Sequence, residues 1–277
     1  MKFTKMQGAG NDYIYINGFE AIPPHLSSLA VKMSDRHFGV GSDGLVMIVP
    51  SKTCDFGMRM FNADGTEAEM CGNAARCVGK YLYDHGMTDK TELTLETLAG
   101  VKRIYLTVAH GRVTSVKVDM GEPRLLPGDL PVLLPGDRVV AQPIEVCGHR
   151  FSMTCVSMGN PHAVIFLDDL QAYDLHAIGR AIEHHELFPR RTNVEFVKVL
   201  APDVLQMRVW ERGAGETLAC GTGACASLVA AVLNDRSRRA ATLRLVGGDL
   251  QIEWDETSNH VFMTGDAVTV FEGTWLE

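Results

Sequence analysis

Two cysteines stand out because each is followed by glycine and a small polar residue at the start of a predicted helix. The segments are Cys-Gly-Asn at 71–73 and Cys-Gly-Thr at 220–222. The free amides of a first helical turn and the positive end of the helix dipole favour a nearby anion. A thiol placed there can have its pKa lowered from ~8.5 to below neutrality, and the same amides can hold a carboxylate. The sequence therefore predicts a thiol base beside a bound carboxylate, twice in one chain.

Two such thiols suit the movement of a proton from one face of an α-carbon to the other. Two neighbouring thiolates repel, so the stable pair is one thiolate and one thiol. The thiolate acts as general base and the thiol as general acid, and the roles exchange for the substrate of opposite hand. Without a cofactor to delocalise the negative charge, the site must exclude water and offer many polar groups. Polar residues of this kind near the cysteines are Asn62, Asn73, Glu211, Arg212 and Thr222.

An internal repeat organises the chain. The shift in numbering that places Cys71 on Cys220 also places Asn11 on Asn160, and we call this shift the repeat offset. It also aligns two helix-like segments, and the matches cluster where Gly, Asn and Cys occur together, without a gap. We therefore expect two homologous halves built from the same elements.

The cysteines must be positioned by short strands and a small number of helices, which are the elements that the sequence predicts. Apolar and polar residues alternate as in strands, with turn residues between the runs. A stretch at 121–143 carries five of the eleven prolines and is expected to connect the halves. The fold class is α+β, with two pseudo-symmetric halves, each a curled, mainly antiparallel sheet around a central helix. Strands are predicted at 93–98, 101–109 and 113–119, and the segments 243–254 (with a Gly-Gly turn) and 261–275 repeat the same hairpin pattern. Helices are predicted at 26–37, 72–83, 175–186 and 221–233.

Composition limits the protein class. A chain of 277 residues with 46% hydrophobic and 22% charged residues is globular, with about two domains. The net charge of −8 argues against nucleic acid and anionic membranes as partners, and no apolar run approaches the ~20 residues of a membrane span. Seven cysteines without a signal peptide or a CxxC pair indicate free thiols in the cytoplasm. Five of them are expected to be buried packing residues: Cys54, Cys77, Cys147, Cys155 and Cys225.

The sequence contains no well-supported motif for binding a cofactor or a metal. GVGSDG at 39–44 matches a dinucleotide pattern, but it follows a helix-like segment where that fold needs a strand. Neither a CxxC pair nor an HExxH motif is present for a metal. No motif indicates a pyridoxal lysine or a nucleophilic serine. We expect no cofactor and no metal.

Four long motifs resemble the diaminopimelate epimerase family. They are FNADGTEAEMCGNAARC (61–77), GNPHAV (159–164), TNVEF (192–196) and WERGAGETLACGTGACAS (210–227), and the resemblance runs essentially end to end. It implies a cytoplasmic homodimer that converts LL- to meso-2,6-diaminopimelate without pyridoxal phosphate or metal, in lysine and peptidoglycan precursor biosynthesis. It also implies that the last strand returns to the first half. The halves are then 1–120 completed by 266–277, and 121–265, with the active site in the cleft between them.

The resemblance also assigns roles to individual residues. Cys71 and Cys220 match the catalytic acid/base pair, while His162 and Glu211 match positions that tune the thiol pKa values. Many family members carry Gln, which contacts substrate, where this chain has Gly44. The positions that match substrate-binding residues are Asn11, Asn62, Gly72, Asn73, Asn160, Asn193, Glu211, Arg212, Gly221 and Thr222.

Two alternatives remain open. A proline or hydroxyproline racemase of the same fold resembles the chain at the cysteines but usually has His where Asn73 stands. It also has no use for a second-carboxylate clamp such as Arg212 with Asn193. A dithiol redox protein would cycle Cys71 and Cys220 through a disulfide, which leaves the carboxylate cradle unexplained. A PhzF-like isomerase fits less well because that branch lacks the cysteine pair.

Overall fold

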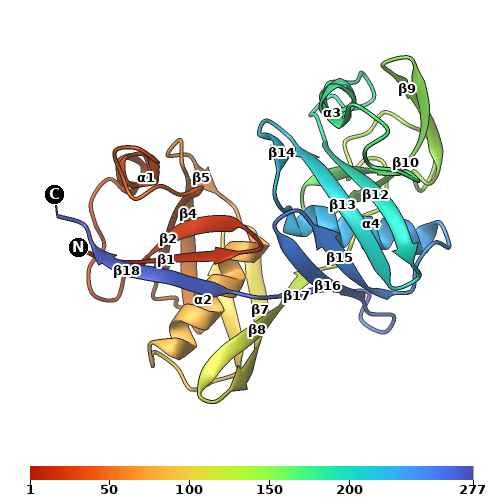
Figure 1. The fold of residues 1–277 in the computed structure, drawn as a ribbon. Coiled ribbons are helices and arrows are strands. Elements are labelled where there is room, and N and C mark those ends of the chain that lie inside the picture. Colours follow the sequence, from red (N-terminus) through yellow and green to blue (C-terminus); the bar gives the residue numbers. More distant parts are fainter. Residues whose placement is uncertain (277) are drawn as a thin grey trace. The chain divides into compact units, whose positions relative to one another are not determined.

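The computed structural model describes residues 1–276 and divides the chain into two compact units. Unit 1 comprises Met1–Asp119 and Thr264–Glu277, and unit 2 comprises Met120–Met263. Figure 1 shows that each unit has a curled sheet and one helix lying against its concave face, α2 in unit 1 and α4 in unit 2.

Unit 1 contains a sheet in the order β18-β1-β2-β3-β4-β6-β7-β8. Its neighbours are antiparallel except for the parallel pairs β2–β3 and β4–β6. The C-terminal strand β18 therefore pairs with the first strand of the chain. The elements are β1 (Lys2–Gly8), β2 (Asn11–Asn17), α1 (Leu26–Ser34), β3 (Gly44–Val49), β4 (Phe56–Asn62), β5 (Glu67–Ala68), α2 (Gly72–Asp84), β6 (Glu92–Thr97), β7 (Gly100–Ala109), β8 (Arg112–Gly121) and β18 (Val268–Thr274).

Unit 2 repeats this order as β9-β10-β11-β12-β13-β15-β16. The parallel pairs are β11–β12 and β13–β15. Strand β9 lies beside β10 as β18 lies beside β1. The elements are β9 (Gln142–Val146), β10 (His149–Ser157), β11 (Pro161–Phe166), α3 (Leu175–Glu183), β12 (Asn193–Ala201), β13 (Val204–Glu211), β14 (Gly215–Thr217), α4 (Gly221–Leu233), β15 (Ala240–Leu245), β16 (Gly248–Trp254) and β17 (Val261–Gly265).

The predicted repeat is present in the structure without a shift of register. The repeat offset relates the start of α2 to that of α4 and the start of α1 to that of α3, and the helices of each pair have equal lengths. The parallel pair Tyr13↔Gly44 between β2 and β3 becomes His162↔Asn193 between β11 and β12. The α+β fold class with pseudo-symmetric halves is confirmed.

The sequence of α4 explains why this central helix is buried. Helix α4 (GTGACASLVAAVL) is apolar on every face, as expected for a helix enclosed by a sheet. Helices α1 and α3 cover the outer faces of the sheets and contribute to a second core in each unit. Both were predicted to be three residues longer. Helix α1 ends at Ser34 because the amides of Val40, Gly41 and Ser42 donate hydrogen bonds to its last carbonyl groups. Helix α3 ends at Glu183, where His184 is the C-cap residue.

The cysteines correct one prediction. Cys77, Cys155 and Cys225 are buried, as expected for packing residues, whereas Cys54 is only half-buried, and none of the seven cysteines forms a disulfide within the described residues. Cys147, however, is exposed. It occupies the turn between β9 and β10 with φ +52°, and residues 147 and 148 both have positive φ, as a tight hairpin turn requires. Cys147 is therefore a turn residue.

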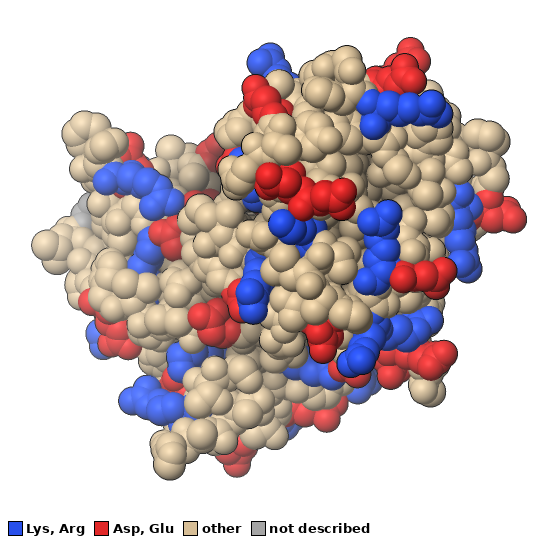
Figure 2. Space-filling model, turned by 45° about the vertical axis from the view of Figure 1, so that its right-hand side comes forward, with Lys and Arg blue, Asp and Glu red and all other residues tan. Residues whose placement is uncertain are grey.

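The charged surface is mixed in sign. On the face of the described chain shown in Figure 2, lysine and arginine side chains alternate with aspartate and glutamate over short distances. That face therefore presents no extended patch of one charge. Among residues 1–276, no helix combines the length and apolar character that crossing a membrane requires.

Candidate active site

The first candidate half-site lies where α2 begins. Cys71 is the N-cap residue in an extended conformation (φ −133°, ψ 125°), and the amide of Ala75 is bonded to its carbonyl at 2.9 Å. The earlier amides of the turn thus lie outside the helical ladder. The Cys71 thiol donates to Oδ1 of Asn11 at 3.2 Å, and Asn73 Nδ2 lies 3.5 Å from the same oxygen. We call Asn11, Cys71, Gly72 and Asn73 the Cys71 half-site.

Polar contacts behind Asn11 hold that side chain in place. Asn11 Nδ2 donates to Oδ2 of Asp43 at 2.8 Å, and Arg36 bridges Asp43 and Asp12 at 2.9 and 3.0 Å. The buried Lys5 completes the network by pairing with Asp12. Asp43 belongs to the GVGSDG segment, so this motif supports the Cys71 half-site through Asn11.

A buried arginine, which sequence reasoning missed, supports Asn73. Arg76 is fully buried, and its Nη1 donates to Asn73 Oδ1 at 2.8 Å. Its Nε donates to the carbonyl of Asp266 at 2.9 Å, which ties the returning C-terminal segment to α2. Position 76 lies on the helix of the cysteine motif, but nothing in the local pattern indicates complete burial of a charged residue.

The second candidate half-site lies where α4 begins, and it is richer in titratable groups. Cys220 is the N-cap residue, and its sulfur accepts from the Gly223 amide at 3.4 Å and lies 3.4 Å from Thr222 Oγ1. Asn160 Nδ2 donates to that hydroxyl at 3.2 Å, and His162 Nε2 lies 3.0 Å from Asn160 Oδ1. The Cys220 half-site comprises Asn160, His162, Glu211, Cys220, Gly221 and Thr222.

The electrostatic surroundings of Cys220 overturn one expectation. A helix start was expected to lower the thiol pKa, and hydrogen bonds from Thr222 and Gly223 do act in that direction. Burial is the larger effect, however, and the negative charges of Glu211 and Glu195 add to it. The pKa of the Cys220 thiol is therefore raised well above its ordinary value.

Glu211 lies beside Cys220 at the end of β13. Burial raises the pKa of its carboxyl, while a hydrogen bond from the hydroxyl of Thr217 acts in the opposite direction. A carboxyl with a raised pKa can exchange protons nearer to neutrality than an exposed one. Thr217 is a supporting residue that the sequence did not single out.

The remaining predicted substrate positions make structural contacts of their own. Asn193 is buried, donates to the carbonyl of Pro161 at 2.9 Å and accepts from the backbone amide of Arg212 at 2.9 Å. Its side chain thus fixes the backbone that carries the exposed Arg212. Asn62, at the end of β4, donates to Thr66 in its own turn at 3.0 Å.

Gly44 is a glycine for a steric reason. A Cβ atom at this position would lie 2.1 Å from the carbonyl oxygen of Phe61 and 2.8 Å from the ring of Tyr13. The β3–β4 pairing therefore leaves no room for the glutamine side chain expected from the family pattern. Any contact of that kind with a substrate must come from another residue.

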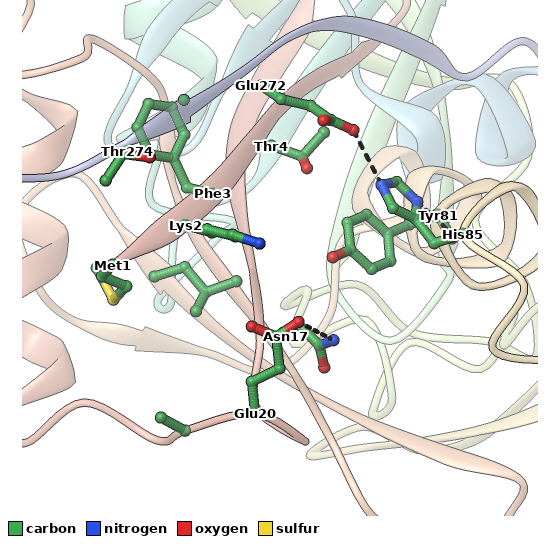
Figure 3. A pocket seen from close by; sticks show the side chains of 13 residues that line it. Met1, Lys2, Phe3, Thr4, Asn17, Glu20, Tyr81, His85, Glu272 and Thr274 are labelled. Atoms are coloured by element: carbon green, nitrogen blue, oxygen red, sulfur yellow. Dashed lines mark hydrogen bonds and ion pairs between the residues drawn. The ribbon is translucent and has the colours of Figure 1, made fainter.

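A separate cavity of about 540 Å³ lies in unit 1, away from every predicted site residue. Figure 3 shows Lys2, Glu20, Tyr81 and Glu272 around it, with a hydrogen bond of 3.1 Å between His85 Nε2 and Glu272 Oε1. The cavity is bounded mainly by β1 and β18 together with the end of α2. None of its lining residues belongs to either half-site.

Comparison with solved structures defines the fold class. A PhzF-family phenazine biosynthesis protein of Bacillus anthracis superposes with a TM-score of 0.72 at 16% identity, covering 100% of this chain and 99% of that one. A probable proline racemase of Agrobacterium radiobacter superposes with a TM-score of 0.70 at 15% identity, covering 99% and 92%. The chain thus has the two-unit fold found in racemases, epimerases and PhzF-type proteins.

Comparison of sequences defines the family. The family model for diaminopimelate epimerase matches residues 3–126 and 154–270. A diaminopimelate epimerase of Acetivibrio thermocellus is 60% identical over 99% of this chain and 98% of that protein. One of Methanococcus maripaludis is 55% identical over 99% of both chains. The chain belongs to the diaminopimelate epimerase family and is an isomerase.

Proposed function

We propose that the protein interconverts LL- and meso-2,6-diaminopimelate by proton transfer between Cys71, Cys220 and one α-carbon of the substrate. The observation that carries this proposal is the matched placement of the two cysteines at the N-termini of α2 and α4 in units of identical register. Family membership at 55–60% identity supports the substrate. The proposed reaction needs neither pyridoxal phosphate nor metal.

The two half-sites supply complementary chemistry. The first-turn amides at Gly72-Asn73 and Gly221-Thr222 are proposed to hold the α-carboxylate, because helix N-termini favour anions. Asn62 and Glu211 are proposed to hold the reacting amino group, and Arg212 the distal carboxylate, which suits its planar two-pronged donor. Asn11, Asn160 and Asn193 complete the substrate-binding set, and His162 tunes the thiols.

Incubation of reduced protein with LL-diaminopimelate in deuterated water tests this function. Because the base that removes hydrogen differs from the acid that returns it, the product should carry a single deuterium at the inverted α-carbon. The protein is dialysed against EDTA and receives no pyridoxal phosphate, so the same assay tests the cofactor proposal. Mass spectrometry and chiral chromatography measure label and configuration.

Proline provides the matched comparison substrate. It has an α-carboxylate and an α-hydrogen but no distal carboxylate for Arg212. We expect inversion of diaminopimelate and none of proline. Racemisation of proline, or inversion of diaminopimelate without label from solvent, would contradict the proposal.

We also propose that the enzyme is a homodimer in the cytoplasm, where it serves lysine and peptidoglycan precursor biosynthesis. Strand β18 exposes Val268, Val270 and Phe271, an apolar surface that a second copy could cover. Seven cysteines outside any disulfide suit a reducing compartment. In the soluble fraction of source cells, the epimerase activity should elute at the mass of two chains. Elution at the mass of one chain would refute the dimer.

A further inference from the structure

A buried histidine–glutamate pair lies beneath the first turn of α4. His162 Nδ1 is 2.7 Å from Glu195 Oε1, and both side chains are fully buried. The other carboxylate oxygen of Glu195, Oε2, is also buried, and no described residue offers it a hydrogen-bond partner. Burial of a carboxyl group in this way costs free energy. The presence of Glu195 at this position therefore needs an explanation other than packing.

Glu195 reaches Cys220 closely because residue 223 is glycine. A Cβ atom on Gly223 would lie 2.6 Å from Glu195 Oε1 and 3.3 Å from Cys220 Sγ. The amide of the same glycine donates to the sulfur at 3.4 Å. A single residue without a side chain therefore separates the carboxylate from the thiol.

The equivalent positions in unit 1 show that this arrangement is specific to Cys220. The repeat offset places Val46 on Glu195 and Ala74 on Gly223, and both unit 1 residues are buried apolar side chains. The registers of β2-β3-β4 and β11-β12-β13 agree residue by residue across these positions. Relative to unit 1, unit 2 therefore has a carboxylate in place of the Val46 side chain and lacks the methyl group of Ala74. These two positions lie close together in unit 2.

A chain of hydrogen bonds runs from this pair to the sulfur. Asn160 Nδ2 donates to Thr222 Oγ1, so Asn160 Oδ1 is the acceptor that faces His162 Nε2. With Nδ1 turned to the carboxylate of Glu195, both ring nitrogens of His162 face oxygen acceptors. The hydroxyl of Thr222, which already accepts from Asn160, can direct its hydrogen at Cys220 Sγ.

We propose that Glu195 is a positioning residue of the epimerase. Its carboxylate fixes the ring of His162, and thereby the hydrogen-bond chain to Cys220, while its negative charge opposes ionisation of that sulfur across Gly223. The expected effect of Glu195 on turnover rests on the proposed function. The corresponding positions near Cys71 hold apolar residues, so Glu195 affects Cys220 and has no counterpart that affects Cys71.

The variant Glu195→Gln tests the proposal, because it keeps the size of the side chain and removes its charge. The pH dependence of alkylation by iodoacetamide is measured for each cysteine by peptide mass spectrometry, without substrate. We expect the midpoint for Cys220 to fall by about one pH unit and that for Cys71 to stay unchanged. The value of kcat should fall by about tenfold, with KM within about twofold.

Controls separate this role from loss of structure. Glu145→Gln, on the exposed face of β9, should leave both alkylation profiles and kcat unchanged. Gly223→Ala keeps the carboxylate but pushes it from the sulfur, so it should slow turnover and change the Cys220 profile alone; it replaces Glu195→Gln if that variant fails to fold. Parallel changes at both cysteines would indicate a merely structural role and overturn the proposal.

Wild-type behaviour of Glu195→Gln in both assays would also overturn the proposal. The alkylation assay uses no substrate. A failure of the proposed function would therefore appear as absent diaminopimelate inversion in the wild-type protein, and the effect of Glu195 on Cys220 would still be measured.

Discussion

Replacement of either Cys71 or Cys220 by alanine is expected to reduce epimerisation of LL-diaminopimelate by at least about 10³-fold. Each thiol supplies one of the two proton transfers, and a positioned general acid or base contributes on the order of 10²–10⁴ in rate. A methyl side chain can neither accept nor return the proton. Product formation is measured by chiral chromatography after long incubation, so that residual turnover is quantified.

The matched control is Cys225→Ala, on the same helix as Cys220 and fully buried. It removes a thiol of the same chemistry and should leave kcat within a few-fold of wild type, because Cys225 lies outside both half-sites. If Cys71→Ala or Cys220→Ala retained wild-type turnover, the two-thiol mechanism would be wrong. If only one of them lost activity, a single-base mechanism would replace it.

The variant Arg76→Met is expected to lower the free energy of unfolding by about 3–5 kcal/mol. The guanidinium is fully buried and donates to both Asn73 Oδ1 and the Asp266 carbonyl. Methionine fills much of the volume but leaves these two acceptors without their donors. Urea denaturation at pH 7, followed by circular dichroism, measures the change.

Arg59→Met is the comparison for that experiment. Arg59 pairs with Glu67 at 2.8 Å, but its side chain is 46% exposed, so its loss should cost less than about 1 kcal/mol. Arg76→Met should also slow turnover in the fraction that remains folded, because Asn73 loses its support. Equal stability of the two variants would show that Arg76 does not anchor the C-terminal segment to α2.

Local patterns predicted much of the site in advance. The internal repeat, the extents of α2 and α4 and the place of each cysteine at a helix start were all visible in the chain. Such features depend on residues close in sequence and on spacing, which a one-dimensional pattern preserves. The contacts of Asn11 with Cys71 and of Asn160 with Thr222 agree with the pairing that the repeat predicted.

The pattern of residues along the chain is thus sufficient to predict two copies of one unit, each with a cysteine at a helix start. The differences between the two cysteines arise from contacts that form when the chain folds. Burial and the charges of Glu211 and Glu195 raise the pKa of Cys220 where a helix start alone predicts the opposite. Arg76 supports only the Cys71 half-site. These effects arise from side chains distant in sequence, whose burial is fixed when the sheet closes around the helix.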